Sequence, residues 1–252
     1  MQPDKNKALI YDDNCPLCKA YTGAFVKGGF LKEENRISFS KVNMHQFNID
    51  WNRARHEIPL INLQTGEVKY GVDALVDILQ QKFFCIKSIM KVNGLNWFFR
   101  KLYKLISYNR KIIVAAKEPK SQSVDCTPDY SFKWRWLLIF VCYSLSNLFT
   151  VTSTDTVFNF FDTGVSPWYA TCWMIVPSLL SLFTSKKTAT DIHAHASVTA
   201  TVTGSLLLFV TNFLKYFYTL PSFFYLLLMV ILVITAKQIV RRYMFVKHSM
   251  VS

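Results

Sequence analysis

The pattern of apolar and polar positions changes sharply near the middle of the chain. Through the first half, short apolar segments alternate with charged ones, which is typical of a domain folded in water. The second half is dominated by four uncharged runs, at residues 136–154, 163–185, 196–214 and 216–236. Each run is close to the roughly 20 residues that a helix needs to cross a membrane. The pattern therefore predicts an α/β domain followed by an α-helical transmembrane region of about four spans.

Within the first half, the apolar periodicity predicts a short series of elements. These are a buried strand at 7–11, a helix at 16–27 ended by two glycines, a strand at 36–42, a weak helix within 43–57, a β-hairpin over 58–70 and an amphipathic helix at 73–79. This order is compatible with a small thioredoxin-like sheet covered by helices. We therefore predict an α/β thioredoxin-like N-terminal domain at residues 1–82.

The remaining chain is predicted to form three regions, namely a basic amphipathic connector at 83–135, the transmembrane region at 136–240 and a basic tail at 241–252. Within the connector, apolar residues recur at helical spacing from Leu95 to Ile106, with basic residues between them. Such a helix is suited to a membrane surface. It could equally pack on the soluble domain as an additional helix. The sequence leaves both interpretations open.

The formal net charge is +13, and the basic residues flank the apolar runs. This distribution favours a lipid bilayer over nucleic acid as the partner. The positive-inside rule places both termini in the cytosol of a multi-pass membrane protein, and the N-terminus carries no apolar signal segment. We expect the inner membrane of a bacterium. The residues that set this orientation are Lys133, Arg135, Lys186, Lys187, Lys237, Arg241, Arg242 and Lys247.

Cys15 and Cys18 are the candidate catalytic residues, because they form a CxxC motif directly after the first predicted strand. This spacing places Cys15 at the N-terminus of the following helix and Cys18 one turn further along. A thiolate at a helix N-terminus is stabilised by free backbone N–H groups and by the helix dipole, which lowers its pKa. The motif therefore predicts a redox dithiol in which Cys15 attacks a disulfide and Cys18 resolves the product.

A zinc site is the main chemical alternative for the two cysteines. Structural zinc needs four ligands at regular spacing, and His45 and His56 do not provide a second pair of that kind. We therefore predict no metal. No bound cofactor is expected either, because the dithiol itself carries two electrons. The expected partners are a protein or small-molecule disulfide and a cellular thiol reductant.

Asp12, Pro16 and Pro59 are candidate supporting residues. Asp12 could accept the proton of Cys18 during resolution, or it could shape the turn before the helix. Pro16 fits the first position of the helix. Pro59 stands where thioredoxin-like folds place a cis-proline facing the dithiol, so both prolines are predicted to shape a substrate groove.

Three further cysteines could take part in electron transfer. Cys126, in the segment before the first apolar run, is a candidate relay thiol if that segment folds back. Cys142 and Cys172 lie in the first and second predicted spans and could form a transmembrane relay. Each of the three could also be a packing cysteine without redox function.

The motif Asp12-x-x-Cys15-x-x-Cys18 after a short strand resembles the signature of the DCC family of thiol-disulfide oxidoreductases (the DUF393 domain). The segments 66–71, 102–110 and 125–128 are similar to later blocks of that family. Asp13 departs from the usual pattern, which has glycine there. The resemblance covers residues 7–128, and it implies a thioredoxin-like fold and disulfide oxidoreductase activity.

We therefore expect a membrane-anchored thiol-disulfide oxidoreductase with its CxxC motif facing the cytosol. Two other functions remain open on the sequence alone. The soluble domain could be a docking module without enzymatic activity, or the whole chain could carry electrons across the membrane through its thiols.

Overall fold

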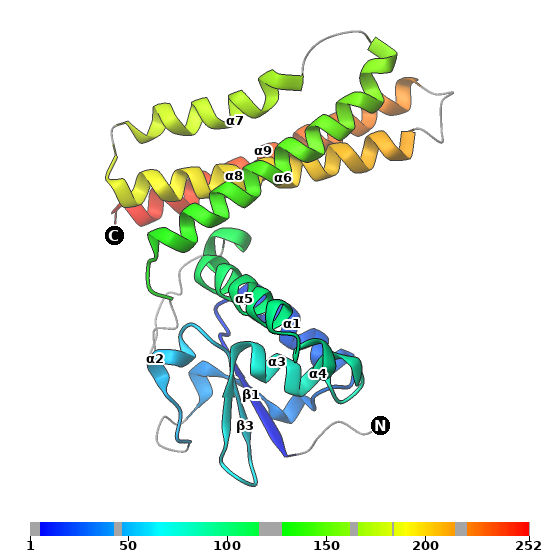
Figure 1. Ribbon diagram of the computed structural model, residues 1–252. Helices are drawn as coiled ribbons and strands as arrows, with labels where there is room; N and C mark the ends of the chain where they lie inside the picture. Colours follow the sequence, from blue (N-terminus) through cyan, green and yellow to red (C-terminus); the bar gives the residue numbers. More distant parts are fainter. Residues whose placement is uncertain are drawn as a thin grey trace. The chain divides into compact units, whose positions relative to one another are not determined.

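The break in the hydrophobic pattern corresponds to a structural boundary, because the chain divides into two units at residues 1–131 and 132–252 (Figure 1). The computed structural model describes residues 6–42, 47–115, 128–161, 166–182, 184–214 and 221–251.

The first unit contains a four-stranded mixed sheet in the order β2-β1-β3-β4. Its strands are β1 (Lys7–Tyr11), β2 (Arg36–Ser38), β3 (Pro59–Asn62) and β4 (Val68–Tyr70). β1 runs parallel to β2 and antiparallel to β3, and β3 runs antiparallel to β4. The parallel pair requires a crossover, which α1 provides, whereas β3 and β4 form the predicted hairpin.

The central strand β1 is apolar throughout its middle because both faces of the sheet are covered. Successive side chains of a strand point to opposite faces, so Leu9 and Ile10 enter two different cores. On one face, Leu9 packs with Leu31, Ile58, Leu60, Ala74 and Ile78. On the other face, Ile10 packs with Phe39, Ile49, Ala54 and Ile61. β1 is therefore fixed from both sides, and the loop that follows it starts from a rigid position.

The helices of this unit are α1 (Pro16–Lys27), α2 (Trp51–Ala54), α3 (Gly71–Leu79), α4 (Cys85–Ile89) and α5 (Asn93–Val114). α5 contacts both α1 and α3. Its C-terminal half buries Leu105 and Ile112, whereas its N-terminal half is largely exposed. The sequence allows this helix either to lie on a membrane surface or to pack on the soluble domain. The C-terminal half of α5 packs on the first unit.

The second predicted strand is shorter than the pattern indicates. β2 ends at Ser38, and a 3₁₀ turn, η2 (Phe39–Lys41), replaces its second half. The turn allows Phe39 to reach the core beneath the sheet, where it is only 4% exposed and contacts Trp51 edge to face. Core packing therefore overrides the strand-like alternation of this segment.

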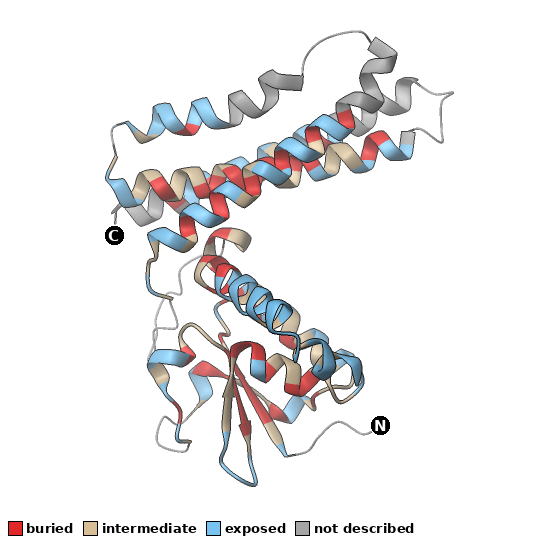
Figure 2. Cartoon of the chain, viewed as in Figure 1, coloured by how far each residue is buried: buried red, intermediate tan, exposed pale blue. Residues whose placement is uncertain are grey.

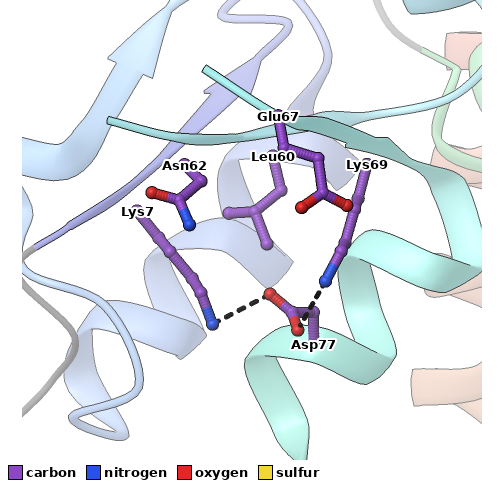
Figure 3. A pocket seen from close by; sticks show the side chains of 6 residues that line it. All are labelled: Lys7, Leu60, Asn62, Glu67, Lys69 and Asp77. Atoms are coloured by element: carbon purple, nitrogen blue, oxygen red, sulfur yellow. Dashed lines mark hydrogen bonds and ion pairs between the residues drawn. The ribbon is translucent and has the colours of Figure 1, made fainter. Parts of the chain in front are cut away.

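A small ion-paired pocket of about 150 Å³ lies at the edge of the first unit (Figure 3). Asp77 of α3 contacts Lys7 of β1 at 2.9 Å and Lys69 of β4 at 3.1 Å. Burial alone would raise the pKa of Asp77, but the two lysines outweigh it and lower the pKa. The carboxylate therefore ties a helix to two strands.

We expect Asp77→Asn to destabilise this unit by about 2 kcal/mol, because two lysines lose their shared anion. Because folding lowers the pKa of Asp77, its contribution is present above the carboxyl's ordinary pKa and is lost as the pH falls toward the folded value. Hydrogen exchange of the β1 and α3 amides measures the effect. Asp73→Asn is the control, because the exposed Asp73–Arg100 pair should contribute at most about 0.5 kcal/mol. Equal losses in the two variants would contradict this prediction.

The second unit is helical, with α6 (Phe132–Phe161), α7 (Ser166–Ser181), α8 (Lys186–Leu214) and α9 (Pro221–Val251). Within the described residues, two segments are long and apolar enough to cross a membrane, Phe132–Ser153 and Lys186–Phe213. By length and composition, these two segments support two of the four predicted spans.

Polar groups connect the helices of the second unit. Thr201 of α8 donates a hydrogen bond to the Cys142 carbonyl of α6 at 2.8 Å. Arg135 pairs with Asp191 at 2.9 Å, and Arg242 lies 3.1 Å from His195. Two of the basic residues that set the predicted orientation therefore also hold helices together, which is a common use of polar side chains in membrane bundles.

Candidate functional site

The two cysteines of the motif lie where β1 delivers the chain to the start of α1. Cys15 is the N-cap residue of α1, and Pro16 occupies the first helical position, where no N–H is required. The backbone N–H of Cys18 donates to Cys15 Sγ at 3.4 Å. Both residues are free thiols and nearly buried, at 4% and 5% exposure. The sulfur of Cys15 therefore occupies the position in which a side chain caps a helix N-terminus.

The environment shifts the pKa values of the two thiols in opposite directions. A hydrogen bond from Cys18 is the largest cause that lowers the pKa of Cys15 to about 6, and the charge of Arg110 adds to it against the effect of burial. The same hydrogen bond and burial raise the pKa of Cys18. At neutral pH the pair therefore holds one thiolate, on Cys15, and one thiol, on Cys18.

Arg110 of α5 supplies a buried positive charge to this pair. Its guanidinium donates to Asp12 Oδ2 at 2.9 Å and lies 4.0 Å from Cys18 Sγ. Burial alone would lower the pKa of Arg110, but the negative charges of Cys18, Asp12 and Cys15 outweigh it and raise the pKa. The second oxygen of Asp12 accepts a hydrogen bond from the N–H of Asn14 at 2.9 Å. Asp12 therefore both shapes the turn before α1 and fixes the cation.

Polar contacts along one face of α5 hold Arg110 in place. The Tyr103 hydroxyl accepts a hydrogen bond from the N–H of Ile58 at 2.9 Å, and the Ser107 hydroxyl donates to the His56 carbonyl. Near the start of the helix, Arg100 contacts Asp73 at 2.6 Å. These contacts fix both the position and the rotation of α5, so that Arg110 points at the dithiol.

A cavity of about 290 Å³ lies beside Cys18. Its polar lining includes Asp12, Cys18 and Arg110, and most of the rest is apolar, contributed by Leu17, Phe25, Phe39, Ala54, Ile58, Leu75 and Ile106. Ser107, Tyr21 and Tyr103 complete the wall, and burial raises the pKa of both phenols. The resolving thiol therefore faces a mainly apolar space.

The two prolines of the predicted groove have different positions. Pro16 is exposed at the start of α1, beside Cys15. Pro59 is fully buried within β3, opposite Tyr70 of β4. Among the described residues no peptide bond is cis, so the prediction of a cis-proline at position 59 is wrong. The neighbouring Ile58, rather than Pro59, lines the cavity, because successive residues of an extended chain point to opposite faces of the sheet.

The three candidate relay thiols lie further along the chain than the dithiol. Cys126 lies outside the described residues. Cys142 is buried in α6, and Cys172 lies in α7, where its side chain is not described. Among the described residues there is also no group of three or more histidine, cysteine or acidic side chains placed to hold a metal ion.

Arg110 is the residue of this site that the sequence pattern does not reveal. It lies 98 positions from Asp12 along the chain. One signal is available, since Tyr103, Ser107 and Arg110 are spaced to share one face of a helix. In an amphipathic helix, a basic residue such as Arg110 is unusual on the face that carries a packing aromatic residue such as Tyr103. Its place on that face is the signal of a buried ion-pair partner, which the structure shows to be Asp12.

Comparison with known proteins assigns this unit to a protein family. A family model described as DCC1-like thiol-disulfide oxidoreductase matches residues 9–115. The match includes the CxxC motif, most of the sheet and the whole of α5, and therefore Arg110. No curated protein and no solved structure matches the chain.

Proposed function

Because residues 9–115 form a domain of the DCC1-like thiol-disulfide oxidoreductase family, we propose that this chain exchanges disulfides through Cys15 and Cys18. The observation that carries this mechanism is the geometry of the pair, in which Cys15 caps α1 and accepts the N–H of Cys18 while Arg110 lies 4.0 Å from Cys18 Sγ, and these surroundings shift the two thiol pKa values in opposite directions. An attacking thiol must be ionised at working pH, whereas a resolving thiol is best kept protonated until the mixed disulfide forms.

In the first step, the Cys15 thiolate attacks one sulfur of a substrate disulfide. A bond forms between Cys15 and that sulfur, the substrate S–S bond breaks, and the other substrate sulfur leaves as a thiolate. In the second step, Cys18 loses its proton and attacks Cys15 Sγ. The Cys15–Cys18 disulfide forms, the second substrate sulfur leaves, and the dithiol has given two electrons to the substrate.

In our proposal, Arg110 and Asp12 serve the second step. Once Cys15 is bonded to the substrate, its negative charge no longer opposes ionisation of Cys18. The guanidinium at 4.0 Å then stabilises the Cys18 thiolate, and Asp12, on the same guanidinium, receives the proton. A cellular thiol reductant would afterwards regenerate the dithiol. No bound cofactor enters this cycle.

The mechanism is tested by capture of the mixed disulfide. We expect Cys18→Ser to accumulate a stable adduct between Cys15 and a chromogenic disulfide, because the resolving sulfur is absent. The adduct is identified by peptide mass spectrometry of the full chain. Cys85→Ser is the matched control, since Cys85 is an exposed thiol on α4. The mechanism would be falsified by an adduct that forms on Cys85 alone while Cys15 stays unmodified.

Two wider features belong to the same proposal. The sheet order, with its parallel β1/β2 pair and antiparallel hairpin, supports a thioredoxin-like fold. The apolar segments in α6 and α8 support anchoring in a membrane. We propose four spans with both termini in the cytosol of a bacterium, where the reducing environment favours reduction of the substrate. A docking module would instead leave the oxidation state of Cys15 and Cys18 unchanged during a redox challenge in cells.

A further inference from the structure

The segment from Lys82 to Ala115, which includes α4 and α5, combines two properties that the dithiol chemistry does not use. It contains eight lysines and arginines and no aspartate or glutamate. Many of its large apolar side chains are also exposed, including Phe83 at 50% and Phe84 at 75%. In Figure 2 the ribbon of the N-terminal half of α5 is mainly pale blue, the colour of exposed residues. The segment is therefore both strongly basic and apolar on its surface.

Five of the exposed apolar residues of α5 form a stripe along the helix. Leu95, Phe99, Leu102 and Ile106 follow one another at intervals of three or four positions, and Phe98 lies three positions after Leu95 and four before Leu102, so the five residues share one side of the helix. Their exposure ranges from 37% at Leu102 to 51% at Phe98. We call these five residues the α5 stripe. In α3, by contrast, the equivalent apolar face is buried in the core.

The rotation of α5 keeps the stripe on the outside of the first unit. Tyr103 is bound to the backbone of Ile58, Arg110 is bound to Asp12, and Arg100 is bound to Asp73. These three contacts use the face of the helix that meets the sheet and α3. Turning the stripe inward would break all of them, including the buried ion pair beside the dithiol.

We propose that the α5 stripe lies in the surface of an anionic lipid bilayer. The segment also carries the complementary charge, since Lys87, Lys91, Lys101 and Lys104 are all exposed. A basic helix with an aromatic and aliphatic face binds at the boundary between headgroups and acyl chains. The same chain also carries α6 and α8, whose apolar segments are long enough to cross that bilayer.

Charge argues against a second copy of the chain as the partner. A symmetric dimer through the α5 stripe would place the same patch of both copies face to face. The basic segments of the two copies would then approach each other, and the segment offers no acidic residue to compensate its lysines and arginines. Anionic headgroups satisfy both the apolar and the charged part of this surface.

Membrane contact at the stripe has a consequence for the dithiol. Ile106 belongs to the stripe and also lines the cavity beside Cys18. The wall of that cavity is therefore shared with the bilayer-facing surface, and substrates held at a membrane would approach from this side.

The test is photolabelling of the full chain in nanodiscs of phosphatidylcholine and phosphatidylserine with a trace of a lipid that carries a diazirine on its acyl chain. We expect lipid adducts on peptides that contain residues 95–106. Phe98→Ser combined with Leu102→Ser should reduce these adducts about fivefold. Leu63→Ser is the control, because Leu63 is exposed on the β3–β4 hairpin, and it should leave the labelling unchanged.

Two further arms separate the alternative outcomes. Lys101→Gln combined with Lys104→Gln should weaken labelling in anionic nanodiscs and not in pure phosphatidylcholine. Adducts on residues 132–153 report anchoring, so their presence without α5 adducts would overturn the proposal. Covalent links between α5 segments of two copies would overturn it as well. Cys15→Ser should label like the wild type, which keeps this result independent of the redox mechanism.

Discussion

Replacing Cys15 with serine is expected to abolish disulfide exchange by the reduced protein. A serine hydroxyl is not ionised at neutral pH, and it is a far weaker nucleophile than the thiolate that Cys15 holds with a pKa of about 6. The remaining thiol, Cys18, has a raised pKa and is therefore protonated. We expect the rate of reduction of a chromogenic disulfide to fall by about three orders of magnitude.

The matched control is Cys85→Ser, which removes an exposed thiol outside the site and should retain the wild-type rate. Circular dichroism of both variants establishes that the fold is intact. A Cys15→Ser protein that still reduces the disulfide at the wild-type rate would show that another thiol, or another site, performs the reaction.

Arg110→Met is expected to shift the ionisation of Cys15 toward higher pH. The hydrogen bond from Cys18 is the largest cause of the low pKa, and the charge of Arg110 lowers it further. In the wild type, alkylation of Cys15 should accelerate as the pH rises through about 6 and then level off. Without the guanidinium, Asp12 acts unopposed on the dithiol, and we expect the midpoint to rise by about one pH unit.

The same substitution leaves a buried carboxylate without its cation, which is expected to cost about 3 kcal/mol of stability. Arg110→Met combined with Asp12→Asn therefore serves as the control, since it removes both charges. The double variant should regain stability while its alkylation midpoint stays above that of the wild type. An unchanged midpoint in both variants would exclude Arg110 from the electrostatics of the site.

The local parts of this fold could be predicted because local sequence determines them. Residues 8–11 are apolar without interruption because β1 is covered on both faces. The helix α1 begins at Pro16, as the position of the proline after the capping cysteine indicates. The predicted place of Cys15 at the helix N-terminus follows from the same signal. Hydrophobic periodicity and capping are short-range properties, and they suffice for this stretch.

Other parts depend on contacts that no local pattern contains. Arg110 reaches the dithiol only because α5 packs on the first unit. The apolar spacing of the α5 sequence by itself is compatible with either packing on the domain or contact with a membrane. The order of elements predicts a cis-proline at position 59. The strand pairing of β3 instead buries it in a trans conformation. Tertiary packing, rather than propensity, decided both positions.

The central claim is that Cys15 and Cys18 form a reversible redox pair. It is tested most directly by equilibrating the full chain in glutathione buffers of increasing oxidised fraction, trapping the thiols by alkylation and mapping disulfide-linked peptides. We predict a peptide linked through Cys15 and Cys18 that forms as the buffer becomes more oxidising and disappears on reduction. If both cysteines remain fully alkylated across the entire range, the account of this site is wrong.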